Sequence, residues 1–448
     1  MKRLAVFFAL LFCISSLPFA LPTQAQADGS IYIKSETAVL IDAQTGAVLY
    51  DKNMNRQMHP ASITKIMTGM LALEMASPDQ MLTTSHNAVY SLPYNTSHIA
   101  LGENEQLTLE QAMYALGIES ANDAANVIAE NLAGSNEVFA QLMTQKAHDL
   151  GAVNTNFTNP HGLPDDNHYT TAYDMALIAA EAIKNESFNR YFSTNRYDMS
   201  PTNTRSEMRQ FWNANYFING YEQCEGLIMS KTGWTQEARH TLVTAAKRGD
   251  TTLVAVVMYS TGKGDKFDDT LALFDYGFNG YTTVQVTDDH IKSSMPAKLE
   301  CAEGEIAVQQ EDCMTGAVYV TAPVGTQEKD ITVSVGTAQV DESGSMATVT
   351  ATLYYSKDGT QVQCGQQTVT VILEHPPAKR FDFTSFALKA FLWLVLIFLV
   401  LVMVLLVFVA LRQVVIIENR RRIRKRRMQQ REMAKSPKNG TEKTVYRK

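Results

Sequence analysis

The sequence predicts an α+β domain, an antiparallel sheet with helices, followed by a small all-β domain and one C-terminal transmembrane helix. Residues 28–282 combine segments of helical apolar period with strands that form antiparallel hairpins. Residues 283–375 alternate apolar and polar side chains in the strand period, between Gly, Asp and Pro. Residues 390–411 carry no charge and are long enough to span a bilayer. The 448 residues are therefore expected to form more than one domain.

Residues 1–27 have the pattern of a secretory signal peptide. Lys2 and Arg3 precede an apolar run, and Ala25-Gln26-Ala27 is a small-residue cleavage pattern. The alternative, a retained membrane anchor, would need a longer apolar stretch. We therefore expect the mature chain to be exported.

The exported portion is expected to begin with a hairpin and a helix. Two strands within residues 37–50 flank the turn sequence Asp42-Ala-Gln-Thr-Gly46. A helix is expected over residues 62–76, because Pro60 is typical of a helix start and apolar residues run almost all the way round the segment. Such a helix should be buried.

The remaining elements follow from apolar period and turn residues. Helices are expected at residues 109–116, 121–132, 138–150 and 172–185. A hairpin is expected from strands 241–248 and 252–260, which flank Gly249-Asp250. Strands of the second domain are expected at residues 283–287, 305–309, 317–321, 331–335, 347–353 and 368–372.

The C-terminal segment predicts the topology. Residues 376–389 form a linker to the predicted span 390–411, and the tail 412–448 carries 14 Lys and Arg against 3 Asp and Glu. The positive-inside rule assigns this tail to the cytoplasm. A nucleic-acid patch is the alternative for a basic run, but directly after a span, contact with anionic lipid is favoured. We expect a single-pass membrane protein whose outer portion is extracytoplasmic.

Charge and cysteine content restrict the partners and cofactors. Without the tail and the signal peptide, the net charge of −7 becomes about −20, so nucleic acid is not an expected partner. Outside the signal peptide, Cys224, Cys301, Cys313 and Cys364 can pair in three ways in an oxidising exterior. Pairing of Cys301 with Cys313 is favoured because the intervening stretch closes a local loop. Neither cysteines nor histidines have metal-ligand spacing, so no metal or cofactor is expected.

Ser62 and Lys65 are the first candidate catalytic residues. On a helix their spacing places both side chains on one face, with Cβ atoms roughly 5–6 Å apart. Partial burial would lower the pKa of Lys65 and provide a neutral amine that activates Ser62. The Ser62 backbone N–H, in the first turn, could face an oxyanion. A second Ser-x-x-Lys match, Ser260 to Lys263, lies in a Gly-rich turn and is interpreted as structural.

Two further segments could complete a site. Ser120-Ala121-Asn122 lies just before a helical segment, so helix capping is its alternative. Lys231-Thr232-Gly233-Trp234 should lie on a strand, where a glycine often marks close approach of a ligand and a lysine can hold a carboxylate. The alternative for Lys231 is an edge-strand lysine.

These three motifs occur in the order known for penicillin-binding proteins and class A β-lactamases. The sequence resembles the D-alanyl-D-alanine carboxypeptidases, the low-molecular-mass penicillin-binding proteins of serine peptidase family S11. The resemblance covers about residues 30–280 and implies a penicillin-binding-protein and β-lactamase-like catalytic domain. The blocks that carry it are Pro60-Ala-Ser-Ile-Thr-Lys-Ile-Met-Thr68, Ser120-Ala-Asn122, Asn159-Pro-His-Gly-Leu163, His168-Tyr-Thr-Thr-Ala-Tyr-Asp174 and Lys231-Thr-Gly-Trp-Thr235.

The resemblance implies three catalytic residues. Ser62 would be the acyl-enzyme nucleophile and Lys65 its general base, while Ser120 would relay a proton to the leaving D-alanine. His161 and His168 are interpreted as structural rather than as ligands.

The substrate-binding residues implied by the resemblance surround this trio. Asn122 would bind the substrate amide, and Lys231 and Thr232 would hold the terminal carboxylate. Gly233 and Trp234 continue this strand, and the backbone N–H of Trp234 would complete an oxyanion hole with that of Ser62.

The implied activity is removal of the terminal D-alanine from a peptidoglycan pentapeptide at the bacterial cell membrane, with β-lactams as covalent inhibitors. Two departures from the family pattern, Met229 in place of a usual glycine and Arg239 in place of a small residue, bear on substrate preference.

Two other functions compete with this interpretation. A class A β-lactamase would need a deacylating glutamate a few dozen residues after the middle motif, and no glutamate occurs between Glu137 and Glu181. A membrane-anchored β-lactam or peptidoglycan sensor without turnover is the other alternative. Against a sensor, the tail of this chain, residues 412–448, is too polar to fold as an effector domain.

Overall fold

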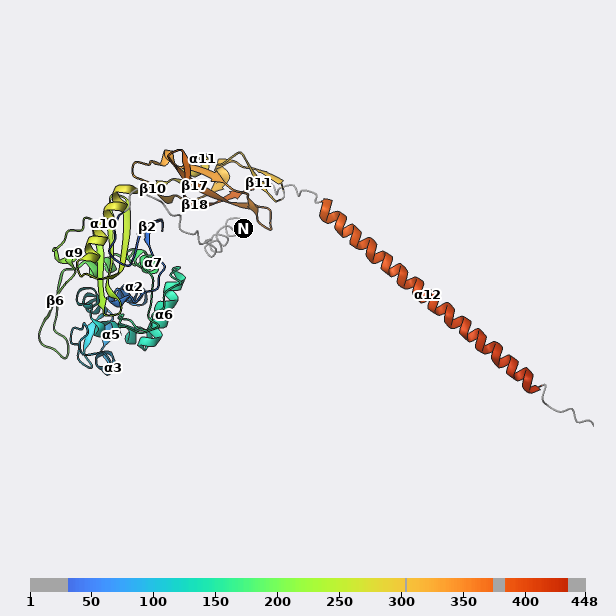
Figure 1. Ribbon diagram of the computed structural model, residues 1–448, viewed down its shortest axis with the longest axis horizontal. Coiled ribbons are helices and arrows are strands. Elements are labelled where there is room, and N and C mark those ends of the chain that lie inside the picture. The colour runs from blue at the N-terminus through green and yellow to red at the C-terminus, as the bar shows by residue number, and fades with distance from the viewer. Residues whose placement is uncertain (1–30, 303, 374–382, 434–448) are drawn as a thin grey trace, which may run out of the picture. The chain divides into compact units, whose positions relative to one another are not determined.

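The computed structural model describes residues 31–302, 304–373 and 383–433 (Figure 1). The predicted signal peptide, part of the predicted linker and the last residues of the tail lie outside these ranges. The chain divides into two compact units, residues 1–377 and 378–448. The first unit contains both predicted domains, and the second contains the C-terminal helix.

A five-stranded antiparallel sheet forms the centre of the N-terminal domain, as predicted. Its strand order is β2-β1-β9-β8-β7, so β7 is an edge strand. The strands are β1 (Thr37–Asp42), β2 (Val48–Lys52), β7 (Leu227–Thr235), β8 (Arg239–Arg248) and β9 (Thr251–Ser260). Strands β1 and β9 come from opposite ends of the domain and pair along their whole overlap.

Helices cover both faces of this sheet. Side chains alternate across a strand, so Val39 and Ile41 share a buried cluster with helices α2 (Lys65–Met75) and α7 (Ala172–Ala182). Ala38 and Leu40 instead pack with helix α10 (Asp265–Gly280). Burial on both faces explains why β1 and β9 are apolar through their middle residues, 38–41 and 253–258.

The other elements of this domain pack in the cluster of Val39 and Ile41, except α9, whose Phe217 packs in the cluster of Leu40. They are α3 (His86–Tyr90), α4 (Leu109–Tyr114), α5 (Asn122–Ala133), α6 (Asn136–Asp149), α8 (Glu186–Ser193), α9 (Tyr216–Asn219), the strand pair β3 (Met81–Thr83) with β4 (Gln106–Thr108), and the pair β5 (Arg196–Met199) with β6 (Arg209–Trp212). The four helices predicted after the Ser62 segment are present with small shifts at their ends. Helices α3, α8, α9 and α10 were not expected.

The predicted helix over residues 62–76 needs a correction. The segment begins with a 3-10 turn, η1 (Ala61–Thr64), and only then becomes the α-helix α2. Helix α4 is likewise followed by a π-helical turn, η2 (Ala115–Glu119). Both irregular turns end next to candidate catalytic residues.

The second domain is mainly β, with one short helix. Strands β10 (Tyr281–Val286) and β14 (Val318–Pro323) pair, as do β11 (Lys298–Cys301) and β12 (Gly304–Ala307). The main sheet contains β13 (Cys313–Met314), β15 (Thr332–Val335), β16 (Gln339–Val340), β17 (Met346–Lys357) and β18 (Thr360–Ile372). Helix α11 (Asp288–Ser293) corrects the all-β prediction. It forms because the Thr287 hydroxyl caps it by accepting the His290 N–H.

A buried carboxylate joins the two domains. Asp42, at the end of β1, is inaccessible to solvent and accepts hydrogen bonds from the hydroxyls of Thr283 (2.7 Å) and Thr321 (2.9 Å). Thr283 belongs to β10 and Thr321 to β14. The hydroxyls of Thr45 and Thr321 are also hydrogen-bonded, at 2.6 Å.

The favoured disulfide is not formed. Cys224, Cys301, Cys313 and Cys364 all have free thiols. Cys301 ends β11, whereas Cys313 pairs with Val371 of the main sheet, so the two cysteines belong to different sheets. The loop between them is closed by the β11–β12 pairing rather than by a covalent bond.

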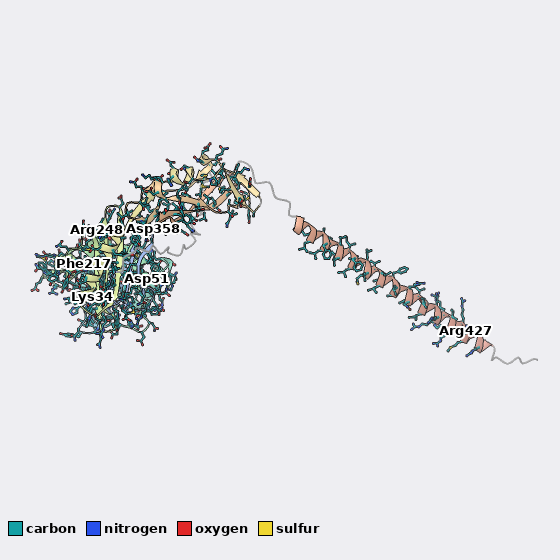
Figure 2. The ribbon with its side chains drawn as sticks, turned by 45° about the horizontal axis from the view of Figure 1, so that its top comes forward. Lys34, Asp51, Phe217, Arg248, Asp358 and Arg427 are labelled. Atoms are coloured by element: carbon teal, nitrogen blue, oxygen red, sulfur yellow. The ribbon has the colours of Figure 1, made fainter. Side chains whose placement is uncertain are left out.

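Helix α12 (Phe383–Met433) forms the second unit. Its segment Leu388–Gln429 is long and apolar enough to cross a membrane, by length and composition. The helix continues beyond the uncharged residues into the basic run that contains Arg427 (Figure 2). This much of the predicted basic tail is therefore helical.

Candidate active site

Ser62 lies in the 3-10 turn η1, in a geometry that aligns it with Lys65. A 3-10 helix has three residues per turn, so side chains at positions i and i+3 eclipse one another. The preceding residue, Ala61, has a left-handed backbone (φ +52°), which L-residues rarely adopt. The Ser62 turn therefore begins at a residue with a strained backbone.

Neighbouring segments hold this turn in place. A Cβ atom on Gly162 (φ +87°) would lie 1.9 Å from the carbonyl oxygen of Ala61, so only glycine fits there. The Thr241 hydroxyl donates to the carbonyl oxygen of Pro60 at 3.0 Å. His168 contacts the Thr64 hydroxyl at 2.9 Å.

Lys65 is completely buried and has three polar contacts. Its Nζ lies 3.2 Å from the Ser62 Oγ and 2.7 Å from both the Asn122 Oδ1 and the His161 carbonyl oxygen. The last two atoms can only accept hydrogen bonds. A neutral amine therefore donates both of its hydrogens to them and directs its lone pair at the Ser62 hydroxyl.

The surroundings favour that neutral amine. Burial, together with the positive charge of Lys231, holds the pKa of Lys65 well below its usual value. The nearby Asp123 acts in the opposite direction but has a smaller effect.

Ser120 and Asn122 contact the two candidate lysines and do not cap a helix. Ser120 ends the π-helical turn in a left-handed conformation (φ +56°), and no side chain caps helix α5 at its start. The Ser120 Oγ accepts a hydrogen bond from the Lys231 Nζ at 2.9 Å. Asn122 instead contacts Lys65. The capping alternative is therefore wrong.

Lys231 is buried although β7 is an edge strand. Only 3% of it is exposed, and burial lowers its pKa to about 7. Strand β7 contacts the Ser62 turn, where a Cβ on Gly233 would meet the Thr241 Oγ1 at 2.4 Å and the Ser62 backbone nitrogen at 2.9 Å. The expected close approach at Gly233 is thus with the protein's own chain.

A cleft of about 520 Å³ opens beside these groups. The predicted residues that line it are Ser62, Ser120, Lys231, Thr232, Gly233 and Trp234. Lys65 and Asn122 are not among its lining residues, although both contact the site. Residues that sequence reasoning did not select also line it: Ser97, Gly117, Ile118, Glu119, Trp212, Asn213, Ala214, Asn215, Ser230, His240, Lys263, Lys266 and Phe267.

Two of the missed residues add positive charge to the cleft. Lys266 is only 3% exposed, and burial with the nearby Lys263 lowers its pKa to about 8. Lys263 belongs to the second Ser-x-x-Lys match, whose serine, Ser260, is buried and hydrogen-bonded to Ser35. That serine is structural, as interpreted, but the lysine lines the cleft. Only its membership of the match could have drawn attention to it.

The two histidines have structural environments. Burial lowers the pKa of His168 to about 3, and burial with the charge of Lys65 lowers that of His161. The His168 Nδ1 accepts the Thr158 N–H, so its Nε2 carries the proton and donates to Thr64. Among the described residues, no cluster of His, Cys, Asp and Glu could hold a metal ion.

The structure explains one departure from the family pattern. Arg239 starts β8 with a left-handed backbone (φ +53°), a conformation that glycine adopts without strain. The arginine therefore keeps the hairpin at the cost of strain and adds an exposed charge beyond Trp234. Met229 is fully buried in the cluster of Val39 and Ile41.

Comparison with known proteins identifies the family. The sequence profile described as D-alanyl-D-alanine carboxypeptidase, peptidase family S11, matches residues 22–262. The chain belongs to this family.

Several members of the family are similar to the chain over most of their length. It is 36% identical over 295 residues to the D-alanyl-D-alanine carboxypeptidase DacF of Bacillus subtilis, covering 63% of this chain and 72% of the relative. It is 28% identical over 304 residues to DacC of Escherichia coli, covering 63% and 70%. The predicted family and hydrolase class are confirmed.

Solved structures share the fold. Penicillin-binding protein 5 of Haemophilus influenzae matches with a TM-score of 0.63 at 22% identity, covering 78% of this chain and 99% of that one. The DD-transpeptidase of Streptomyces K15 matches with a TM-score of 0.52 at 28% identity, covering 56% and 99%. The penicillin-binding-protein fold is therefore confirmed.

Proposed function

We propose that this protein is a serine-type D-alanyl-D-alanine carboxypeptidase that trims peptidoglycan pentapeptides. The contact between the Lys65 Nζ and the Ser62 Oγ is the observation that carries the proposal. Membership of family S11 supports the substrate class, because its relatives are named for this activity. β-Lactams acylate the same serine as covalent inhibitors.

Acylation begins with the transfer of the Ser62 hydroxyl proton to the neutral Lys65 amine. Asn122 and the His161 carbonyl hold this amine, so its lone pair needs no reorientation. The Ser62 oxygen then attacks the carbonyl carbon of the penultimate D-alanine. The backbone N–H groups of Ser62 and Trp234 stabilise the resulting oxyanion.

The cations of the cleft bind the substrate's C-terminal carboxylate. Lys231 and Lys266 are buried there without a carboxylate partner in the described structure, and Thr232 adds a hydroxyl on the same strand. A bound carboxylate raises the pKa of Lys231 and keeps it charged. As the peptide C–N bond breaks, Ser120, hydrogen-bonded to Lys231, relays to the nitrogen of the departing D-alanine the proton that Lys65 took from Ser62. The neutral Lys65 amine then takes a proton from the water that attacks the Ser62 ester and returns it to the Ser62 oxygen as the ester bond breaks.

We further propose the arrangement of the whole chain. The parts are a signal peptide (1–27), an extracytoplasmic catalytic domain (28–282), a β domain (283–375), a linker (376–389), a single membrane span (390–411) and a basic cytoplasmic tail (412–448). The apolar segment of α12 and the family's cell-wall substrates support this single-pass arrangement.

The decisive assay measures D-alanine release from a defined pentapeptide by the full-length protein in detergent. We expect release by the native protein and none by Ser62→Ala. Intact-mass measurement should find one penicilloyl adduct on the native protein. An adduct that persists on Ser62→Ala would overturn the assignment of the nucleophile.

A further inference from the structure

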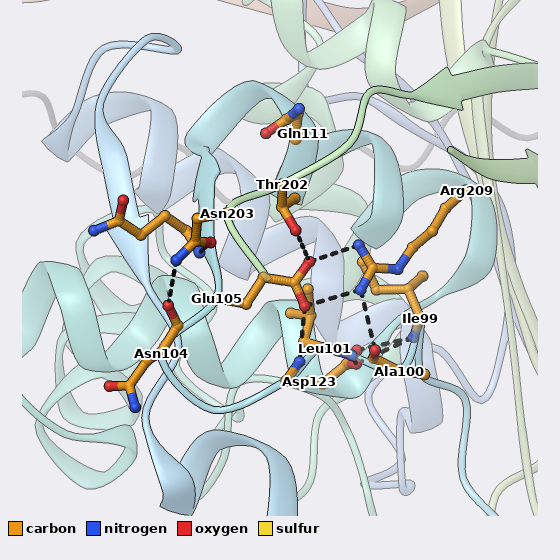
Figure 3. A network of polar contacts seen from close by, with 12 residues as sticks. Ile99, Ala100, Leu101, Asn104, Glu105, Gln111, Asp123, Thr202, Asn203 and Arg209 are labelled. Carbon is orange, nitrogen blue, oxygen red and sulfur yellow. Dashed lines mark hydrogen bonds and ion pairs between the residues drawn. The ribbon is translucent and has the colours of Figure 1, made fainter. Parts of the chain in front are cut away.

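A buried ion pair outside the cleft joins two segments that carry cleft residues. They are the loop 97–105, which contains Ser97, and strand β6, which contains Trp212. The Arg209 guanidinium donates to both carboxylate oxygens of Glu105, at 2.6 and 2.9 Å, although 104 residues separate them. Glu105 is 1% exposed and Arg209 7% exposed. The Thr202 hydroxyl and the Gly102 N–H also donate to the carboxylate (Figure 3).

Stability alone is a poor explanation for such a pair. Taking two charges out of water costs free energy that their attraction often fails to recover, and apolar residues of similar volume can be as stabilising. Burial acts to raise the pKa of Glu105, but hydrogen bonds from Arg209, Gly102 and Thr202 outweigh it and lower the pKa. The pair is therefore ionised, and what it provides is a fixed two-point geometry.

On one side, the pair holds the loop of residues 97–105. The Arg209 Nη2 also donates to the carbonyl oxygen of Ala100, a residue with a left-handed backbone (φ +52°). The N–H groups of Ile99 and Leu101, on either side of Ala100, donate to the Asp123 carboxylate. These contacts connect the loop to the start of helix α5.

The same loop also contacts Asn122 directly. The Asn122 N–H donates to the carbonyl oxygen of Ser97 at 2.8 Å, and Ser97 lines the cleft. Asn122 in turn positions the Lys65 amine through its Oδ1. A displacement of the loop would thus reach the general base through the Asn122 backbone N–H and then through the Asn122 side chain.

On the other side, the pair holds strand β6. Arg209 is the first residue of this strand, and Trp212 at its end lines the cleft together with Asn213. The Trp212 N–H donates to the Glu119 carboxylate at 2.8 Å, next to Ser120. Strand β6 is therefore held at both ends, by the ion pair at Arg209 and by the hydrogen bond at Trp212.

We propose that the Glu105–Arg209 pair is a positioning device for acylation that sets the spacing between two segments that carry cleft residues, the loop 97–105 with Ser97 and strand β6 with Trp212. Neither residue lines the cleft or touches Ser62 or Lys65. The inference rests on the proposed function, since it concerns the rate at which Ser62 is acylated.

The test measures saturation kinetics of a fluorescent penicillin on the full-length protein in detergent. The double variant Glu105→Gln with Arg209→Met removes both charges and leaves neither unpaired. We expect its acylation rate constant to fall at least tenfold, while the dissociation constant of the non-covalent penicillin complex stays within threefold, because Lys231 and Lys266 are untouched. Arg209→Lys keeps the charge but not the two-point contact, and should retain an intermediate rate.

A control removes a more exposed ion pair of the same domain. Glu74→Gln with Lys146→Met eliminates a 2.9 Å pair between α2 and α6, outside the cleft, and should leave the acylation rate unchanged. A folded double variant that acylates within twofold of the native rate would overturn the proposal. So would loss of the fold in both Arg209 variants, which would assign the pair to stability. Absence of acylation in the native protein would instead refute the proposed function.

Discussion

The side-chain nitrogen of Lys65 lies 3.2 Å from the hydroxyl oxygen of Ser62, and its other two polar contacts are both with oxygen acceptors. An ammonium group would have to donate its third hydrogen to Ser62. A neutral amine instead accepts the serine proton. The lowered pKa of Lys65 favours the second arrangement.

Replacement of Lys65 by arginine separates these roles. Arginine keeps the positive charge but cannot lose its proton at any ordinary pH. We expect Lys65→Arg to lose acylation by roughly 100-fold or more, the usual contribution of a general base. The measurement is the rate of acylation by a fluorescent penicillin as a function of pH. Circular dichroism checks that the variant is folded. Near-native acylation by a folded Lys65→Arg protein would refute the base assignment.

Two glycines with similar positive φ angles test the packing of the nucleophile turn. Gly162 and Gly134 both have φ above +80°, but an added Cβ meets the Ala61 carbonyl only at Gly162. Gly134→Ala should cost about 1 kcal/mol of unfolding free energy from backbone strain alone. Gly162→Ala should cost several times more and abolish acylation. Urea unfolding of both variants gives the comparison, and equal losses would contradict it.

The buried charge of Lys266 predicts a pH-dependent stability. Its pKa is about 8 when folded and 10.5 when exposed, so the unfolded chain holds more protons between these values. Lys266 therefore destabilises the fold below pH 8, and the penalty disappears as the pH rises toward 10.5. The difference between these two pKa values corresponds to a loss of roughly 3 kcal/mol of unfolding free energy below pH 8.

Lys266→Met should raise the melting temperature at pH 6 and lose this advantage near pH 10.5. It should also weaken binding of carboxylate-bearing penicillins. Thermal unfolding across this pH range checks the stability effect, and the exposed Lys184→Met serves as control, since its surface ion pair contributes little. A pH-independent gain would show that Lys266 is not desolvated.

Asp42 should matter for the joint between the domains but not for catalysis. Asp42→Asn weakens charge-assisted bonds to Thr283 and Thr321, and should cost about 1–3 kcal/mol. As a control, Asp358→Asn lies at an exposed turn of the β domain and should leave the free energy of unfolding unchanged. Acylation of the folded Asp42 variant should stay within twofold of native, and a larger loss would connect the joint to the cleft.

The penicilloyl ester should be long-lived. Among the described residues that line the cleft, Glu119 is the one acidic side chain, and its carboxylate accepts the Trp212 N–H. Because strand β6 holds one oxygen of this carboxylate, we expect Glu119 not to activate water as the carboxylate of a β-lactamase does. Nitrocefin turnover should be slow, and Glu119→Gln should not change it. Rapid turnover would restore the β-lactamase alternative.

The sequence determined those parts of the site that are local. Ser62 and Lys65 are three residues apart, so any helical turn brings them together, and the structure changes only the type of turn. The alternation of Val39 and Ile41 with Ala38 and Leu40 likewise predicts a strand before any partner is known.

Only the tertiary structure decided which distant groups meet. Lys231 reaches Ser120 across 111 residues, Lys266 enters the cleft from an unpredicted helix, and Arg209 finds Glu105 across 104 residues. The free thiols of Cys301 and Cys313 show the limit of the same reasoning, since closeness in sequence did not bring them together. Periodicity constrains the neighbours of a residue within a few positions. Contacts between distant segments depend on how the whole sheet and its helices pack, and burial, which sets the pKa of each lysine, follows from that packing.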